Sequence, residues 1–393
     1  MRGAEAVLAC LREQDVDTVF GYPGGMILPL YDALYGQTEI RQILVTHEQN
    51  AAHAADGYAR ATGRVGVCIA TSGPGATNLV TGIATAYMDS IPMVAITGQV
   101  DLEMLGRDAF QETDILDVTM PVTKHNYKIK NAADLVPTIR EAFALARSGR
   151  PGPVLIDVPR NLFFEEVAYT EQKREERRPG KPDADFAICA AEAAAEIVNA
   201  ERPLVIVGGG VISAGASAQT IAFIEKYKLP VVHTLMGMGG IPSTHPQMLG
   251  FIGMHGAKTA NYAVGAADLV IALGSRFADR QTGNLSKFTA NRKFIHIDID
   301  PAEIDKIVGS SIGLAGDMCV ILNLLMRQAP KSDYAAWWQQ LHTWQEEFAY
   351  DYHSDALSVP WALNQVARMT AGKACAYATD VGQHQMWAAL HLR

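Results

Sequence analysis

The sequence is poor in cysteine and contains no long hydrophobic run. Its five cysteines are scattered through 393 residues and never have CxxC spacing. That pattern argues against a disulfide framework or a zinc site and fits a reducing compartment. No apolar run is long enough to span a bilayer, and residues 1–5 are not typical of a secretory signal. We therefore expect a soluble cytoplasmic protein that does not associate with a membrane.

Positive charge is also scarce. The chain has 33 lysines and arginines against 42 aspartates and glutamates, a net charge of -9, and its basic pairs at 173–174 and 177–178 are short. A nucleic-acid partner is therefore not expected. The hydrophobic share of 49% and the charged share of 19% allow large buried cores and argue against global disorder. A chain of this length holds two or three domains at roughly 100–200 residues each.

Apolar strands alternate with helical segments along the chain. This alternation predicts an α/β fold of successive doubly wound, mainly parallel sheets. The expected strands are 18–20, 40–45, 64–70, 92–97, 153–158, 204–207, 231–234, 269–273 and 294–299. We expect 40–45 to end as a buried strand, because Ile43, Leu44 and Val45 are apolar. A further strand at 375–379 and a helix after it would begin an incomplete third domain.

The predicted domain organisation follows from a shift in composition. Residues 168–185 are polar, charged and contain two prolines, so we expect a linker there. The domains are then 1–167, 186–350 and 351–393.

Glu48 lies where a predicted strand hands over to an alanine-rich helix. It is either an acid in the first helical turn, favoured by the helix dipole, or a working acid in a dry site, where burial is costly without hydrogen bonds. The turn 21–25, the loop 71–78 and Gly98-Gln99 also follow predicted strands. Ligands bind at the carboxyl ends of strands in open α/β sheets. This convergence favours the functional interpretation of Glu48.

Strand-end loops in the second half have suggestive chemistry. The turn 208–210 is glycine-rich, which lets a backbone approach a diphosphate or simply makes a tight connection. Asp298 and Asp300 would bind ribose hydroxyls or cap a helix before a proline. Arg276 and Arg280 would bind phosphate or lie at the surface. The turn lacks the GxGxxG pattern, so a nicotinamide dehydrogenase is a poor candidate.

Ten motifs in order resemble acetolactate synthase (acetohydroxyacid synthase) catalytic subunits, which use thiamine diphosphate and carry FAD. They are GYPGG (21–25), HEQ (47–49), TSGPGATN (71–78), DSIPMVAITGQV (89–100), DAFQETD (108–114), RPGPVLIDVPR (150–160), GMHG (253–256), GSRFADR (274–280), HIDIDPAEI (296–304) and TDVGQHQMWAA (379–389). The resemblance runs from end to end of the chain.

The resemblance implies three domains: 1–167 binding the pyrimidine ring, 186–350 binding FAD, and 351–393 beginning the diphosphate-binding domain. Glu48 matches the glutamate that hydrogen-bonds the aminopyrimidine ring and favours the tautomer that makes the reactive ylid. The other implied thiamine contacts are Pro23, Ser72, Asn78, Gly382, Gln383 and His384. The implied substrate contacts are Gly25, Phe110 and Gln111. The implied FAD contacts are Arg160, Gly209, Gly210, Thr234, Leu235, Met254, His255, Gly274, Arg276, Asp279, Arg280, Asp298, Ile299 and Asp317.

The implied reaction decarboxylates pyruvate and condenses the resulting hydroxyethyl carbanion with a second pyruvate or with 2-oxobutyrate. It serves the biosynthesis of valine, leucine and isoleucine. FAD would be mainly structural. The resemblance also implies a homodimer or tetramer and a possible small regulatory subunit.

The sequence departs from the family pattern at the metal site. The Gly-Asp-Gly that would help to bind Mg²⁺ is absent, since the one Gly-Asp, at 316–317, precedes methionine. We therefore expect no metal ligands in this chain and a truncation within the third domain, so that any Mg²⁺-binding motif would lie beyond Arg393. Whether Arg393 is the natural end of the polypeptide does not follow from the sequence.

Two expectations about activity follow from that departure. The chain alone should have little or no synthase activity, while its FAD affinity should be kept. The alternatives are another enzyme with these cofactors (pyruvate oxidase or glyoxylate carboligase) or a non-catalytic FAD-binding assembly fragment.

Overall fold

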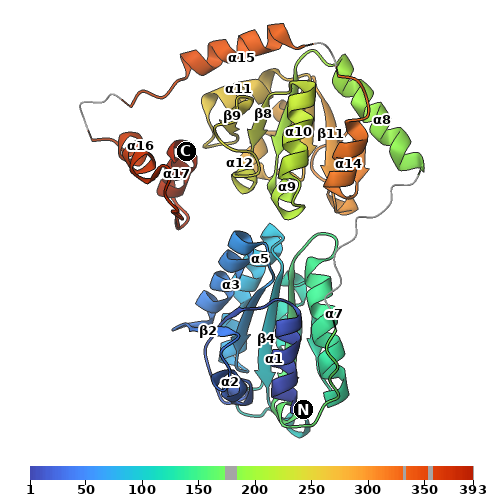
Figure 1. The fold of residues 1–393 in the computed structure, drawn as a ribbon, viewed down its shortest axis with the longest axis vertical. Coiled ribbons are helices and arrows are strands. Elements are labelled where there is room, and N and C mark those ends of the chain that lie inside the picture. The colour runs from blue at the N-terminus through green and yellow to red at the C-terminus, as the bar shows by residue number, and fades with distance from the viewer. Residues whose placement is uncertain (173–183, 331–332, 353–356, 393) are drawn as a thin grey trace. The chain divides into compact units, whose positions relative to one another are not determined.

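The computed structural model describes residues 1–172, 184–330, 333–352 and 357–392, and they form two compact units, one on each side of 173–183. Each unit contains a six-stranded sheet whose paired strands are all parallel, with helices on both faces (Figure 1). This architecture confirms the predicted fold of successive doubly wound parallel sheets.

Two sequence-based expectations fall on residues that the structure does not describe. Most of the predicted linker, 168–185, lies outside the described residues. So does Arg393, and the expectation that a metal-binding motif would follow it stays a prediction. The domain boundaries also stay a prediction.

The first sheet has the strand order β2-β1-β3-β4-β6-β5. The chain passes from β1 outward to β2 and then returns to β3 on the other side of β1, so the direction of winding switches between β1 and β3. Ligands of such sheets bind at this switch, beyond the carboxyl ends of the strands. The strands are β1 (Thr18–Gly21), β2 (Arg41–Leu44), β3 (Gly66–Ala70), β4 (Met93–Gln99), β5 (His125–Lys128) and β6 (Pro153–Pro159).

Both faces of the first sheet are covered. Along β4, Val94 and Ile96 pack into the core beneath α1, α2 and α7, whereas Met93 and Ala95 pack beneath α3, α4 and α5. This alternation follows the two-residue period of a strand. Since both faces are buried, the central strands are apolar throughout, as parallel sheets require. The helices are α1 (Gly3–Glu13), α2 (Leu28–Tyr35), α3 (Glu48–Thr62), α4 (Pro74–Asn78), α5 (Val80–Asp89), α6 (Ile115–Thr119) and α7 (Leu135–Arg147).

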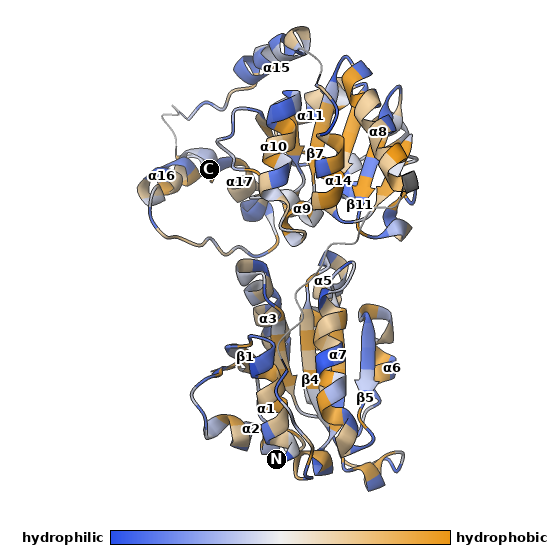
Figure 2. Cartoon of the chain, turned by 45° about the vertical axis from the view of Figure 1, so that its right-hand side comes forward, coloured by the Kyte–Doolittle hydropathy of each residue, from blue (hydrophilic) through white to orange (hydrophobic). Residues whose placement is uncertain are grey.

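The second sheet has the strand order β12-β11-β10-β7-β8-β9, so its winding switches between β7 and β10. Its central strands are apolar, as Figure 2 shows for β7. The strands are β7 (Pro203–Val207), β8 (Val231–His233), β9 (Met248–Phe251), β10 (Leu269–Leu273), β11 (Lys293–Asp298) and β12 (Ile312–Ala315). The helices include α8 (Ala184–Asn199), α9 (Gly209–Ser213), α10 (Ser217–Tyr227), α11 (Lys258–Ala266), α12 (Asp279–Thr282), α13 (Leu285–Thr289), α14 (Met318–Leu325), α15 (Ala335–Glu347), α16 (Val359–Thr370) and α17 (Gln383–His391).

The structure corrects two strand predictions. β2 is not buried: it is an edge strand, and its Leu44 side chain is 64% exposed. Residues 375–379 form no strand, although α17 follows them as predicted. A strand requires a neighbouring strand for its backbone hydrogen bonds, and 375–379 pairs with none among the described residues.

Three short strands were not predicted. β5 is hydrophilic, blue in Figure 2, so it lacks the apolar signal of a strand. β9 and β12 have only four residues each and both contain glycine. All three are edge strands, and an edge strand needs fewer apolar residues than a central strand. In the part of the chain that the structure describes, no helix is both long and apolar enough to cross a membrane.

Candidate functional site

Glu48 lies at the carboxyl edge of the first sheet and is buried, with 8% of its surface exposed. It is the first residue of α3, whose N-cap is His47. Asn78, the last residue of α4, donates a hydrogen bond from Nδ2 to Glu48 Oε2 over 2.9 Å. Oε1 receives no hydrogen bond from the described residues. The carboxyl group therefore has one oxygen held by the protein and one left for a ligand.

Glycines let two loops meet beside this carboxyl group. A Cβ atom added at Gly75 would lie 2.7 Å from Thr71 Cγ2 and 3.2 Å from Glu48 Oε1. One added at Gly24 would lie 2.5 Å from Thr71 Cγ2. Thr71 Oγ1 also accepts a hydrogen bond of 3.2 Å from the Met26 backbone N–H. The turn after β1 and the loop after β3 are thus in contact, and neither glycine has room for a side chain.

Ser72 supplies an unsatisfied polar atom at the same place. Its side chain is 1% exposed, and its hydroxyl makes no hydrogen bond within the described residues. Because buried hydroxyls are nearly always hydrogen-bonded, this one indicates a missing partner. Pro23 is half-buried, and a Cβ at Gly25 would meet no described atom within 4 Å. The orphaned hydroxyl, the glycine cradle and Oε1 of Glu48 fit a flat, polar ring.

Two of the predicted substrate residues, Phe110 and Gln111, lie on a loop that reaches Gly73, beside Ser72. Phe110 is 82% exposed, and Gln111 has a backbone φ of 59°. A Cβ atom at Gly73, whose own φ is 58°, would lie 2.7 Å from the Gln111 carbonyl oxygen. The loop carrying Gln111 and the carboxyl group of Glu48 therefore flank one turn, Gly73–Gly75.

Sequence reasoning missed a polar group buried behind this loop. Asp157 in β6 is fully buried and accepts hydrogen bonds from Thr97 Oγ1 over 2.7 Å and from Gln99 Nε2 over 3.0 Å. Burial raises the pKa of Asp157 to about 6, although both hydrogen bonds oppose that rise. The signal in the sequence was a lone acid inside an apolar strand, PVLIDVP. Its partners, 58 and 60 residues away, gave no such signal.

In the second unit, glycines follow β7 and β10, the two strands between which the winding direction changes. A Cβ atom at Gly208 would lie 2.1 Å from the Gly274 carbonyl oxygen, and one at Gly210 would lie 2.6 Å from Gly274 Cα. The Gly210 N–H donates to Gly274 O over 3.1 Å. Beside them, Thr234 Oγ1 accepts from the Gly237 N–H over 3.1 Å. The structure thus brings together the predicted FAD contacts that follow β7, β8 and β10, namely Gly209, Gly210, Thr234, Leu235 and Gly274.

Other predicted FAD contacts lie around this cluster. The Met254 N–H donates to Arg280 O over 2.9 Å, which joins the loop after β9 to α12. Asp298 ends β11 and accepts from the Asp300 N–H over 3.0 Å. Asp317 caps α14, since its Oδ1 accepts from the Cys319 N–H over 3.0 Å. Asp300 likewise caps the turn at 301–303, the capping role that its sequence position suggested.

Two predicted groups stand apart from these clusters along the chain. Arg160 belongs to the first unit, where its guanidinium carbon lies 5.5 Å from the centre of the Phe164 ring. Gly382 is the N-cap of α17, and Gln383 and His384 at its start are exposed. Among the residues described, no group of three or more His, Cys, Asp or Glu side chains is placed to hold a metal ion.

Known proteins match both units. Residues 1–118 match the family described as thiamine pyrophosphate enzyme, N-terminal TPP binding domain, and residues 190–325 match thiamine pyrophosphate enzyme, central domain. The fold and its matches define the chain as part of a thiamine-pyrophosphate-type enzyme.

Relatives that match this chain along its whole length define the family more closely. The chain is 46% identical over 404 residues to the acetolactate synthase large subunit of Parasynechococcus marenigrum, covering 100% of this chain and 65% of that protein. It is 44% identical over 402 residues to the acetolactate synthase large subunit of Haemophilus influenzae, covering 100% of this chain and 70% of that one. A probable acetolactate synthase large subunit of Methanocaldococcus jannaschii is 45% identical over 412 residues, with coverages of 99% and 68%. The chain belongs to the acetolactate synthase large-subunit family.

Proposed function

We propose that this chain carries the pyrimidine-binding and flavin-binding parts of an acetolactate synthase. The enzyme would join pyruvate to a second pyruvate, or to 2-oxobutyrate, with loss of carbon dioxide, and so serve branched-chain amino acid biosynthesis. The single observation that carries the proposal is the arrangement at Glu48, where a buried carboxyl group keeps Oε1 for a ligand while Asn78 holds Oε2 at 2.9 Å.

Thiamine diphosphate, when bound, supplies a ring carbon that becomes a carbanion. Glu48 would hydrogen-bond the pyrimidine ring through Oε1 and share a proton with a ring nitrogen. Asn78 would keep the carboxyl group from rotating. The ring would supply the partner that the buried Ser72 hydroxyl lacks within the described residues, and Pro23 would lie beside the ring. Gly25, Phe110 and Gln111 would contact the 2-oxoacid.

We assign FAD to the second unit. A dinucleotide binds where the winding of an α/β sheet switches and glycines let a backbone approach its phosphates, and Gly208, Gly210 and Gly274 supply such a place between β7 and β10. Asp298 at the end of β11 would take ribose hydroxyls. Arg276 and Arg280 would face the phosphates, and Arg160 is a further proposed FAD contact. We assign Mg²⁺ no ligands within 1–393.

The domain roles and assembly are part of the proposal. Residues 1–167 would bind the pyrimidine, 186–350 the flavin, and 351–393 would contribute Gly382, Gln383 and His384 to the diphosphate. We propose a cytoplasmic homodimer or tetramer with a small regulatory subunit. Size-exclusion chromatography with light scattering measures the first, and co-purification with a small subunit tests the second.

The function is tested on the complete polypeptide that the gene encodes. Pyruvate, thiamine diphosphate, Mg²⁺ and FAD are supplied, and acetolactate is measured after acid conversion to acetoin. We expect acetolactate from the wild type and a loss of at least about 100-fold in Glu48→Gln, within the range typical of a lost acid–base group. Oxygen uptake without acetolactate would indicate an oxidase, and product from glyoxylate alone would indicate a glyoxylate carboligase. An active Glu48→Gln variant would contradict the role of Glu48.

A further inference from the structure

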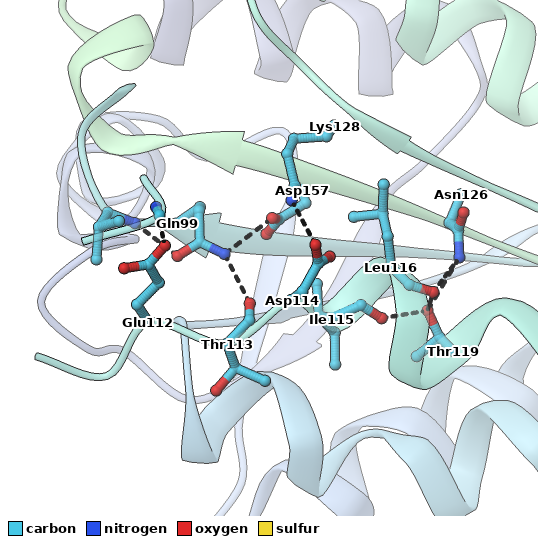
Figure 3. Close-up of polar contacts among 12 residues, drawn as sticks. Gln99, Glu112, Thr113, Asp114, Ile115, Leu116, Thr119, Asn126, Lys128 and Asp157 are labelled. Carbon is cyan, nitrogen blue, oxygen red and sulfur yellow. Dashed lines mark hydrogen bonds and ion pairs between the residues drawn. The ribbon is translucent and has the colours of Figure 1, made fainter. Parts of the chain in front are cut away.

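We propose that Asp157 is a positioning residue: through Gln99 it fixes the loop 106–114, and thereby holds Gln111 against the turn at Gly73. Asp157 itself does not contact the predicted site residues. It acts through two hydrogen bonds made by one amide group (Figure 3). The proposal rests on the proposed function for the meaning of Gln111, but the contact itself does not.

The first step is the orientation of Gln99. Its Nε2 donates to Asp157 Oδ2 over 3.0 Å, and its Oε1 accepts from the Val100 N–H over 2.9 Å. Asp157 in turn is fixed by Thr97 Oγ1 at 2.7 Å. An amide group has a donor end and an acceptor end. With an acceptor on one side and a donor on the other, the Gln99 amide has a single favourable orientation.

The second step is the hold on the loop. The other Nε2 hydrogen of Gln99 is donated to the Thr113 carbonyl oxygen, 2.9 Å away. Both hydrogens of the amide are then used, one on β6 and one on the loop. The Gln99 side chain is buried and the Thr113 carbonyl is partly buried, so losing this donor would cost the loop one of its hydrogen bonds to the sheet.

The third step is the rigidity of the loop itself. Glu112 accepts hydrogen bonds from the backbone N–H groups of Gly106, at 2.5 Å, and Ala109, at 2.9 Å. Asp114 forms an ion pair with Lys128 Nζ over 3.2 Å. The loop is thus closed upon itself by Glu112 and anchored at its end by Thr113 and Asp114. Movement of Thr113 would carry Gln111, two residues earlier in the loop, away from Gly73.

Burying the Asp157 carboxyl group in the core lowers the stability of the fold, which suggests that the residue has a role of this kind. A buried carboxyl group with only two neutral hydrogen-bond donors is less favourable than an apolar side chain of similar shape. Thr97, Gln99 and Asp157 lie on the same face of adjacent paired strands, with Thr97 opposite Asp157 in the register of β4 and β6. A valine or leucine would fill the same place in the core, but it would leave Gln99 without an acceptor.

The experiment compares three changes by hydrogen–deuterium exchange of the loop amides in the full chain. Asp157→Leu branches at the same atom and removes the acceptor, so we expect exchange in 106–114 to rise about tenfold. Asp157→Asn keeps an acceptor oxygen for Gln99, so exchange should stay within about twofold of the wild type. The pair Gln99→Glu with Asp157→Asn reverses the polarity: the strand-to-strand hydrogen bond is kept, but a carboxylate faces Thr113 O.

The reversed pair separates positioning from plain stability. We expect its thermal unfolding, followed by circular dichroism, to shift no more than that of Asp157→Leu, because the strand-to-strand hydrogen bond is kept, while its loop exchanges about tenfold faster than that of the wild type. Restored protection of the loop in this pair, or unchanged protection in Asp157→Leu, would overturn the proposal. Tyr227→Phe, which removes a buried 2.7 Å hydrogen bond to Leu325 O in the second unit, should leave the loop unchanged.

Kinetics connect the loop to the site. In the complete polypeptide, Asp157→Leu and the reversed pair should raise the KM for pyruvate about tenfold with a smaller change in kcat, because a displaced Gln111 weakens substrate binding. Asp157→Asn, which keeps the acceptor for Gln99, should have the KM of the wild type. Loop exchange that responds as expected in a protein that makes no acetolactate would refute the proposed function and leave the positioning role standing.

Discussion

Asn78 and Glu48 are joined by a 2.9 Å hydrogen bond between Nδ2 and Oε2, although they lie 30 residues apart and belong to different helices. The bond crosses from the loop after β3 to the start of α3. It satisfies a buried carboxyl oxygen that would otherwise be unpaired.

Removing the amide should therefore destabilise the first unit. We expect Asn78→Ala to lower its free energy of unfolding by about 1–3 kcal/mol, the cost of a buried polar group that loses its partner. All five tryptophans lie in the second unit, at 337, 338, 344, 361 and 387. Urea unfolding followed by far-UV circular dichroism should then shift, whereas tryptophan fluorescence should not. Asn50→Ala, on the exposed face of α3, is the matched control and should shift neither signal.

Two glycines near Glu48 should respond in opposite ways to the same change. At Gly75 an added Cβ would lie 2.7 Å from Thr71 Cγ2, so Gly75→Ala should displace the loop, cost about 1–3 kcal/mol as overpacking does, and weaken thiamine diphosphate binding. At Gly57, within α3, an added Cβ meets no described atom within 4 Å. Gly57→Ala should stabilise the unit by about 0.5–1 kcal/mol. Thermal unfolding by circular dichroism measures both, and a stabilising Gly75→Ala would show that the loop yields.

The second unit offers a similar pair. Gly274 has a φ of 57°, and an added Cβ would lie 2.5 Å from Gly210 Cα. Gly274→Ala should lower the stability of this unit by about 2 kcal/mol or more, through both strain and the clash. It should also remove the visible flavin absorbance of the purified protein. Gly265→Ala in α11, where the Cβ meets no described atom within 4 Å, should keep the flavin and the tryptophan fluorescence transition. Flavin retained in Gly274→Ala would contradict the proposed FAD site.

Asp157 should make stability depend on pH in an unusual direction. Its pKa of about 6 lies above its value in the unfolded chain, so between these values the folded state binds more protons. The wild type should therefore gain stability relative to Asp157→Asn as the pH falls from 7 to 5. The nearby charges are Lys128, which lowers this pKa, and Asp114, which raises it. Thermal unfolding of both proteins across this range measures the difference, and a pH-independent difference would contradict the elevated pKa.

Local patterns were sufficient for the central strands and most helices, but not for the edges of the sheets. β3 and β4 were predicted because a strand buried on both faces is apolar at every position. β2 contains apolar residues too, yet it lies at the edge with Leu44 exposed. Its place depends on the order of strands, which local sequence does not encode. The segment 375–379 has the composition of a strand but lacks a neighbour to pair with in the described chain.

In the candidate site, too, some features follow from local sequence and others depend on how the strands are paired. Glu48 stood out because several strand ends converge on one edge of a parallel sheet, and the structure does place Asn78 and the 71–78 loop beside it. The partnership of Gln99 with Asp157 bridges 58 residues and is set by the register of β4 against β6. That register cannot be deduced from the spacing of residues along the chain.

The packing of Gln111 on Gly73 has a consequence for how specificity could change. The three atoms nearest to a Cβ placed at Gly73 would be the Gln111 carbonyl oxygen, Cβ and Cα, which every residue except glycine also possesses. A new residue other than glycine at 111 would keep these three atoms, and asparagine would accept the φ of 59° with less strain. The proposed substrate contact could therefore be varied at this position without changing the backbone atoms that face Gly73.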